Sequence, residues 1–232
     1  FLNLYHIFKV KTMETKKACE EFLSILLKGE RQKGLDLVNE LLADNKGVQQ
    51  IYEEVIKPAM YKVGELWENG TISVASEHLA SAIVESILGQ LYYRVITSAG
   101  HKDKVAVISS VEQEVHQIGA KMVSDVFELN GWTSHFLGAN TPIDELIKFI
   151  DKINPNTLGL SISIDMHIDY LERTIKKVRD KFPEIPVLIG GQGLIEEGKD
   201  IMLKHHGVLY LKDLSALESF LKQPLYDKAG VN

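Results

Sequence analysis

The feature that most constrains the fold is a regular alternation, from residue 104 onwards, of short apolar runs with amphipathic stretches. We expect strands at KVAVISSV (104–111), WTSHFLG (132–138), TLGLSISI (157–164), PVLIGG (186–191) and GVLYLKD (207–213), each followed by a helix. Five strands that alternate with five helices imply a parallel sheet covered on both faces. Right-handed crossovers and short loops favour a flavodoxin-like (Rossmann-like) topology for this α/β region.

The region before residue 99 has a different period. Apolar residues share one helical face at Leu35, Val38, Leu41 and Leu42, and another at Ile51, Val55, Ala59, Val63 and Leu66. Glycine-containing breaks separate four such segments, which predict an N-terminal four-helix bundle. The predicted organisation is an N-terminal extension (1–13), a bundle that caps the sheet domain (14–98), a flavodoxin-like domain (99–223) and a C-terminal tail (224–232).

Composition excludes several classes of protein. The chain has 232 residues and a net charge of −6, and no run of Lys and Arg forms a basic face, so direct binding of nucleic acid is not expected. No stretch approaches the roughly 18 apolar residues of a membrane span. The single cysteine, Cys19, fits a reducing compartment and a packing role. We therefore expect a cytoplasmic protein that does not bind membranes.

Ligands of open α/β sheets bind beyond the carboxyl ends of the strands. After the first predicted strand comes EQEVHQIG, which places Glu114 two residues before His116 and Gly119 three residues after it. The histidine could be a metal ligand, a catalytic base or part of an ordinary turn. Glu114 could accept the N–H of the imidazole and fix its tautomer, and Gly119 would allow a bulky group to approach.

Other residues are expected at the same edge. Ser161 and Ser163 lie within the third predicted strand, and GGQG (190–193) follows the fourth; its glycines suit either a groove for a ligand tail or a tight βα turn. Asp165 and His167 suggest an acid–base pair or a plain surface loop. Neither a phosphate-binding glycine fingerprint nor a G-x-S-x-G elbow is present, so nucleotide and nucleophilic chemistry are disfavoured.

A second group of residues lies in the predicted bundle. GELWENGTISVASEHLAS places Trp67 at a helix end and Glu77 and His78 in the first turns of the next helix, with Ser73 as its cap. Taken singly, the tryptophan is typical of a core residue and the Glu–His pair of a solvated face. Together they could form the roof of a pocket.

These motifs resemble those of cobalamin-binding modules with a four-helix cap, over roughly residues 14–223. The family pattern is D/E-x-H-x-x-G, then S-x-L, then G-G, which here reads Glu114-Val115-His116-Gln117-Ile118-Gly119, Ser161-Ile162-Ser163 and Gly190-Gly191. The resemblance implies that His116 is the lower axial ligand of cobalt and that Glu114 holds it. The nucleotide tail of the cofactor would then pass Ser161 and the glycine pair. Ser163 departs from the leucine that is frequent in the family.

The cap motif W-x₉-E-H is similar to that of light-sensing, cobalamin-dependent transcriptional regulators. By that resemblance Trp67, Glu77 and His78 cover the upper face of the corrin. Two departures are evident: no DNA-binding domain is expected before the bundle, and Glu68 stands where these regulators carry a histidine directly after the tryptophan. Glutamate in the E-x-H motif also favours this group, because methyl-carrying corrinoid proteins usually have aspartate there.

The resemblance supports two functions. The first is a stand-alone light receptor, not itself an enzyme, that binds adenosylcobalamin or methylcobalamin and signals to a protein partner or through a changed homo-oligomer; some relatives are thought to add a bilin, which leaves biliverdin open as a second chromophore. The second is a corrinoid methyl carrier between two methyltransferases. A flavodoxin-like protein that binds no corrinoid is the third and least specific alternative.

Overall fold

The computed structural model describes residues 2–97 and 103–222 and divides the chain into two compact units, one up to Arg94 and one from Val95. The sequence places this boundary a few residues later, between 98 and 99. Helix α1 begins at Leu2, so the described part of the predicted extension 1–13 is continuous with the first helix.

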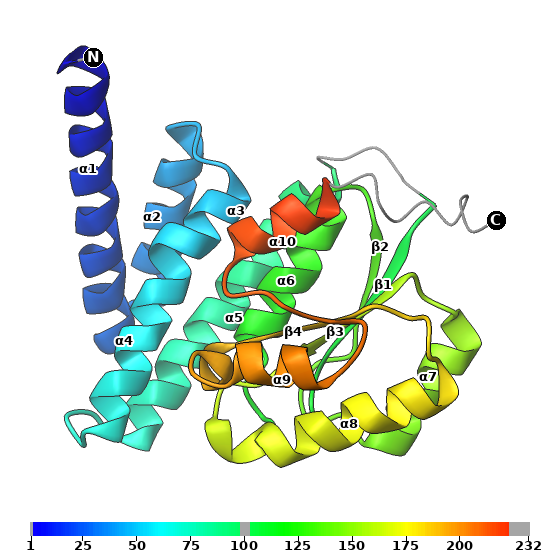
Figure 1. The fold of residues 1–232 in the computed structure, drawn as a ribbon. Helices are drawn as coiled ribbons and strands as arrows, with labels where there is room; N and C mark the ends of the chain where they lie inside the picture. Colours follow the sequence, from blue (N-terminus) through cyan, green and yellow to red (C-terminus); the bar gives the residue numbers. More distant parts are fainter. Residues whose placement is uncertain (1, 98–102, 223–232) are drawn as a thin grey trace. The chain divides into compact units, whose positions relative to one another are not determined.

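The first unit is helical and contains four rod-like segments among the residues described (Figure 1). Their bounds are α1 (Leu2–Leu27), α2 (Arg31–Ala43), the continuous run of α3 (Val48–Ile51), the π-helical turn η1 (Tyr52–Ile56) and α4 (Lys57–Glu68), and α5 (Val74–Ile96). Pro58 lies just after the π-helical turn. Its ring lacks an N–H and would clash with the carbonyl four residues before it, which gives a reason for the wider turn.

Apolar residues at helical spacing form the core of this unit, as the sequence predicts. Val38, Ile51, Val55, Ala59 and Val63 are all buried. Helix α5 begins where expected, because the hydroxyl of Ser73 accepts a hydrogen bond from the backbone N–H of Ser76 (3.1 Å). This bond satisfies one of the four N–H groups that a helix start leaves without an intrahelical partner.

The second unit is the predicted α/β fold. Five parallel strands lie in the order β2-β1-β3-β4-β5, with bounds β1 (Val105–Ser110), β2 (Thr133–Phe136), β3 (Thr157–Ser161), β4 (Val187–Gly190) and β5 (Val208–Tyr210). The connecting elements are α6 (Ile118–Leu129), α7 (Ile143–Ile153), η2 (Asp165–His167), α8 (Ile168–Lys181), η3 (Gln192–Leu194), α9 (Gly198–Lys204) and α10 (Leu214–Leu221). This is the flavodoxin-like order, and the predicted fold class is confirmed.

Helices cover both faces of the sheet (Figure 1). Alternate strand residues such as Val107, Leu160 and Ile189 pack with the apolar faces of α7, α8 and α9 in one buried cluster, and α6 packs beside α10 on the other face. Strand β3 ends at Ser161 and not at the predicted Ile164. Ser163 consequently lies in a loop.

Within residues 2–97 and 103–222, none of the helices combines the length and apolar character that a transmembrane segment requires.

Candidate functional site

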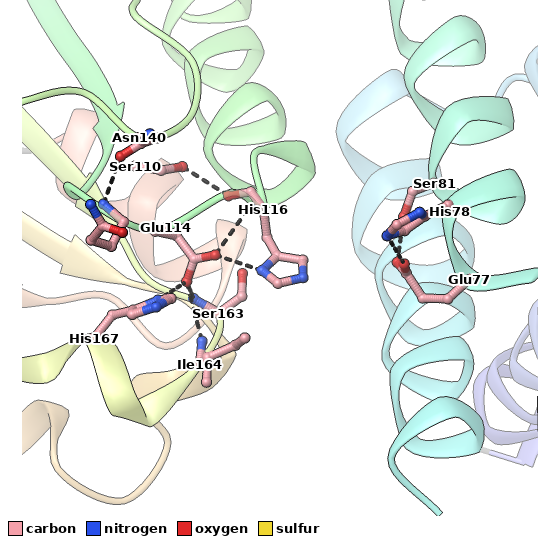
Figure 2. A network of polar contacts seen from close by, with 11 residues as sticks. Glu77, His78, Ser81, Ser110, Glu114, His116, Asn140, Ser163, Ile164 and His167 are labelled. Atoms are coloured by element: carbon pink, nitrogen blue, oxygen red, sulfur yellow. Dashed lines mark hydrogen bonds and ion pairs between the residues drawn. The ribbon is translucent and has the colours of Figure 1, made fainter. Parts of the chain in front are cut away.

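The loop between β1 and α6 carries Glu114 and His116 at the carboxyl edge of the sheet (Figure 2). The Glu114 side chain is fully buried, whereas 39% of the His116 side chain is exposed. A buried carboxylate beside a partly exposed imidazole is an arrangement in which the acid orients the base and the base meets the ligand.

Both oxygens of Glu114 accept several hydrogen bonds (Figure 2). Oε1 accepts from the backbone N–H of His116 (2.9 Å) and from its ring Nδ1 (2.5 Å). Oε2 accepts from the backbone N–H groups of Ser163 (2.8 Å) and Ile164 (3.3 Å) and from Nδ1 of His167 (3.0 Å). The carboxylate thus joins the loops that follow β1 and β3.

These bonds keep Glu114 ionised. Burial alone would raise the pKa of the carboxyl group, but the hydrogen bonds from His116, Ser163 and His167 outweigh it and lower the pKa from 4.5 to about 2. An ionised carboxylate only accepts, so Nδ1 of His116 must carry the proton. In the neutral ring Nε2 then carries the lone pair, and neutral imidazole is the form of histidine that binds metals.

The neighbouring loop after β2 holds the backbone of this segment. Asn140 accepts from the N–H of Gln113 through its side-chain Oδ1 (2.8 Å) and donates its own N–H to the carbonyl of Glu114 (2.7 Å). Both Asn140 (φ +49°) and Gln113 (φ +70°) adopt the left-handed conformation. The hydroxyl of Ser110 also donates to the carbonyl of His116 (2.8 Å). The loop that carries Glu114 and His116 is therefore held from two sides.

Gly119 and Ser161 lie next to each other beside this loop. Gly119 is exposed in the first turn of α6, and a Cβ atom added there would meet only the Oγ atom of Ser161, at 3.9 Å. The space in front of Gly119 is thus open and bordered by a hydroxyl group. Such a place suits the close approach of a ligand, as the sequence predicts.

Ser163 and the pair of Gly190 and Gly191, which the sequence also predicts at the site, have contacts within the protein itself. Ser163 contacts Glu114 through its backbone N–H. Gly191 has φ +115°, and a Cβ atom there would lie 1.9 Å from the carbonyl oxygen of Ile162; at Gly190 it would lie 3.0 Å from that of Leu211. The glycine pair therefore allows backbones after β3, β4 and β5 to pack closely.

In the helical unit, Trp67 lies in the last turn of α4 and Glu77 in the first turn of α5. The tryptophan is 40% exposed, so its interpretation as a core residue is wrong. Glu77 accepts from the hydroxyl of Ser81 (2.7 Å), and its Oε2 lies 3.7 Å from Nε2 of the exposed His78 (Figure 2). This group presents a flat aromatic ring and an imidazole at the surface of its unit.

The sequence did not reveal the role of His167. Its suggested partnership with Asp165 is wrong, because Asp165 accepts from the N–H of Met166 (2.8 Å), whereas His167 points to Glu114. The sequence feature that could have indicated this contact is the position of His167 just after β3, at the same sheet edge as His116. The contact could not be inferred from spacing, because 53 residues separate His167 from Glu114.

The site fits a cofactor that brings its own metal. Among the described residues, no group of three or more His, Cys, Asp or Glu side chains could hold a metal ion. The chain instead offers one imidazole, His116, oriented by a buried carboxylate next to the open space at Gly119. A single imidazole donor suits a metal that already has the four ring nitrogens of a corrin.

Comparisons with known proteins agree with this chemistry. Two family models match the chain, each described as a B12 binding domain, over residues 18–92 and 104–210. The first covers the helical unit, and the second covers the sheet as far as β5. Together they include the E-x-H-x-x-G motif and the tryptophan at the end of α4.

The relatives include a transcriptional repressor and corrinoid proteins. The chain is 28% identical over 157 residues to the HTH-type transcriptional repressor CarH of Myxococcus xanthus, a match that covers 67% of this chain and 51% of the repressor. It is 25% identical over 147 residues to dimethylamine corrinoid protein 1 of Methanosarcina mazei, covering 61% of this chain and 67% of that protein. The chain thus spans about half the length of the repressor.

A solved structure shows the same fold. The monomethylamine corrinoid protein of Methanosarcina barkeri superposes with a TM-score of 0.75 at 14% identity, over 89% of this chain and 98% of that protein. The family models, the oriented imidazole and the common fold lead to one conclusion. The chain belongs to the family of proteins with B12-binding domains, and cobalamin is its cofactor.

Proposed function

We propose that this protein is a cobalamin-dependent light sensor in which His116 is the lower axial ligand of cobalt. The observation that carries the ligand assignment is the bond between Nδ1 of His116 and the fully buried Glu114 (2.5 Å). This bond places a proton on Nδ1, so that Nε2 of the neutral ring is the donor to a metal, and it fixes the direction of the ring. When bound, cobalamin supplies an organometallic bond that either light or a methyl acceptor can break.

The sensor function is supported by residues of the helical unit. Trp67, Glu77 and His78 match the W-x₉-E-H pattern of the light-sensing regulators, and CarH is a relative at 28% identity. We propose that these three residues contact the upper side of the cofactor. The exposure of Trp67, at 40%, supports a role in binding.

Reconstitution with adenosylcobalamin in the dark tests this proposal. We expect the absorption spectrum after green light to differ lastingly from that of the photolysed cofactor in free solution, and the elution volume on size exclusion to change. His116→Ala should alter the dark spectrum, whereas His206→Gln, at an exposed histidine of the same unit, should not. Light sensing would be contradicted if the photoproduct had the spectrum of the photolysed free cofactor and the elution volume stayed that of the dark protein.

Methyl transport is the second candidate. The match to dimethylamine corrinoid protein 1 covers 67% of that protein, whereas the match to CarH covers 51% of the repressor. The imidazole that Glu114 holds suits both functions, because His116 would hold the cofactor in the same way in a sensor and in a carrier. The direct test is to incubate the reduced cobalamin complex with a methylamine and a methylamine methyltransferase. Formation of methylcobalamin on the protein, without a protein-specific response to light, would replace the sensor by a carrier.

A further inference from the structure

Strand β2 forms one edge of the sheet, because β1 is its only partner among the described strands. An edge strand has a row of backbone N–H and C=O groups that no neighbouring strand meets, and a second chain can pair with this row and extend the sheet. The strand at the opposite edge, β5, has only three residues. Strand β2 has four, and Leu137 beyond its end still donates to β1. The β2 edge is therefore the longer of the two.

The backbone N–H groups along β2 point alternately towards β1 and away from it. Those of Thr133 and Leu137 donate to carbonyl groups of the segment that forms β1, at 2.9 and 2.8 Å. Because the direction reverses from one residue of a strand to the next, the N–H groups of Ser134 and Phe136 face the open side. These two residues offer the donors that an added strand would use.

A side chain already occupies one of these two places. Glu128 lies in the last turn of α6, and its Oε1 accepts from the backbone N–H of Ser134 at 2.8 Å. This distance is ordinary for a hydrogen bond between neighbouring strands. The carboxylate oxygen of Glu128 thus takes the place that a carbonyl oxygen of a sixth strand would have.

The turn between α6 and β2 brings Glu128 to this position. The backbone N–H of Trp132 donates to the carbonyl of Phe127 (3.1 Å), and the rings of these two residues pack edge to face with centroids 5.2 Å apart. The hydroxyl groups of Ser124 in α6 and Ser134 in β2 form a second link between helix and strand (2.9 Å). Glu128 therefore reaches the edge from a turn that has several contacts of its own.

We propose that Glu128 blocks this edge of the sheet against a second copy of the chain. An incoming β2 strand would have to displace the carboxylate from Ser134 and leave it without that partner, and both changes disfavour pairing. The excluded partner is a second copy, because two β2 strands related by a two-fold axis offer each other the same outward groups. The inference does not depend on the proposed ligation of cobalt.

Three substitutions separate the acceptor from the charge. Glu128→Ala removes the acceptor, whereas Glu128→Gln keeps an acceptor oxygen at the same length and should block the edge as glutamate does. Glu145→Ala is the control, because it removes a negative charge from a 62% exposed side chain of the same unit. Alanine is a strong helix former and Glu128 is only half-buried, so the variant should fold. Glu128→Leu, which has similar length and no acceptor, replaces it if urea unfolding shows otherwise.

The first readout is the self-association constant from sedimentation velocity. The full chain is used with cobalamin bound, in the dark, over a range of concentrations. We expect the constant of Glu128→Ala to be about tenfold or more above that of the unmodified protein, because a hydrogen bond to a charged acceptor corresponds to a factor of this size. Glu128→Gln and Glu145→Ala should resemble the unmodified protein. No increase in Glu128→Ala, or an equal increase in either of the other two variants, would overturn the proposal.

The second readout is hydrogen–deuterium exchange of the same samples, which locates the contact. In dilute Glu128→Ala the amide of Ser134 should exchange faster than in the unmodified protein, because its acceptor is gone. At high concentration the amides of Ser134 and Phe136 should become protected, since the second copy now pairs with them. Association that leaves both amides unprotected would place the contact elsewhere and overturn the proposal. Unchanged exchange of Ser134 in the dilute variant would also overturn it.

Discussion

The loop of Glu114 and His116 in the sheet unit and the group of Trp67, Glu77 and His78 in the helical unit are built in opposite ways. Glu114 is fully buried and accepts five hydrogen bonds. Trp67 is 40% exposed, and the side chain of His78 is 73% exposed. One group is restrained before any ligand binds, whereas the other has surface available for contact. The difference teaches that one protein can restrain one group of polar side chains by burial and hydrogen bonds while it leaves another exposed and adaptable.

The largest effect should come from Gly191→Ala. A Cβ atom would lie 1.9 Å from the carbonyl oxygen of Ile162 at a backbone φ of +115°, so the loops after β3 and β4 must separate. We expect destabilisation of more than about 4 kcal/mol, or failure to fold, in urea unfolding. Gly64→Ala in α4 is the control; a Cβ atom there meets nothing within 4 Å, and stability should rise by about 0.5–1 kcal/mol. Equal changes in the free energy of unfolding for Gly191→Ala and Gly64→Ala would contradict this difference in packing.

Glu114→Gln should have the next largest effect. The amide keeps the shape but loses the charge, and its NH₂ group would face the N–H donors that now meet Oε1 or Oε2. Unfolding of the cofactor-free protein should show a loss of about 3 kcal/mol. In the helical unit, Glu77→Gln should cost at most about 1 kcal/mol, because its bond to Ser81 can be kept. A loss as large at Glu77 would mean that both groups are equally restrained.

Acid stability should depend on the same carboxylate. The folded pKa of Glu114 is about 2, below its ordinary 4.5, so its contribution is complete above pH 4.5 and is lost as the pH falls towards 2. A difference of this size corresponds to about 3 kcal/mol. Urea midpoints of the cofactor-free protein between pH 5 and 2 should therefore fall less steeply in Glu114→Gln than in the unmodified protein. Parallel curves would place the acid sensitivity elsewhere.

Trp67→Ala should have the smallest effect on stability. Because the ring is 40% exposed, its removal should change the free energy of unfolding of the cofactor-free protein by about 1 kcal/mol or less. Val63→Ala, at a fully buried position of the same helix, should cost more. Thermal unfolding compares the two variants. A larger loss for Trp67→Ala than for Val63→Ala would show that the tryptophan serves the core of the bundle.

Much of the fold follows from local patterns. The strand order and the two sheet faces agree with the alternation of apolar runs, because right-handed crossovers leave few alternative topologies. The hydrogen bonds that Glu114 accepts from His116 are also local, since two residues on one short loop can meet without any other element. The predicted end of β3, at residue 164, was three residues too late, because the apolar Ile162 and Ile164 continue the strand pattern into a loop.

The distant contacts of the site could not be predicted in the same way. Asn140 lies 27 residues from Gln113, and His167 lies 53 residues from Glu114. Their meeting depends on the register of β1 with its neighbours and on the left-handed backbone of Asn140. No spacing rule connects residues that different strands bring to one edge.

The sequence by itself determined the βα alternation, the helical first region and the pairing of Glu114 with His116, because each depends on residues close in the chain. Only the tertiary structure decided that Glu114 is fully buried, that it is shared with His167 and that its pKa lies near 2. The physical reason is that burial and shared hydrogen bonds arise when separate loops pack at one sheet edge. The ionised state of Glu114 is therefore a property of the folded unit.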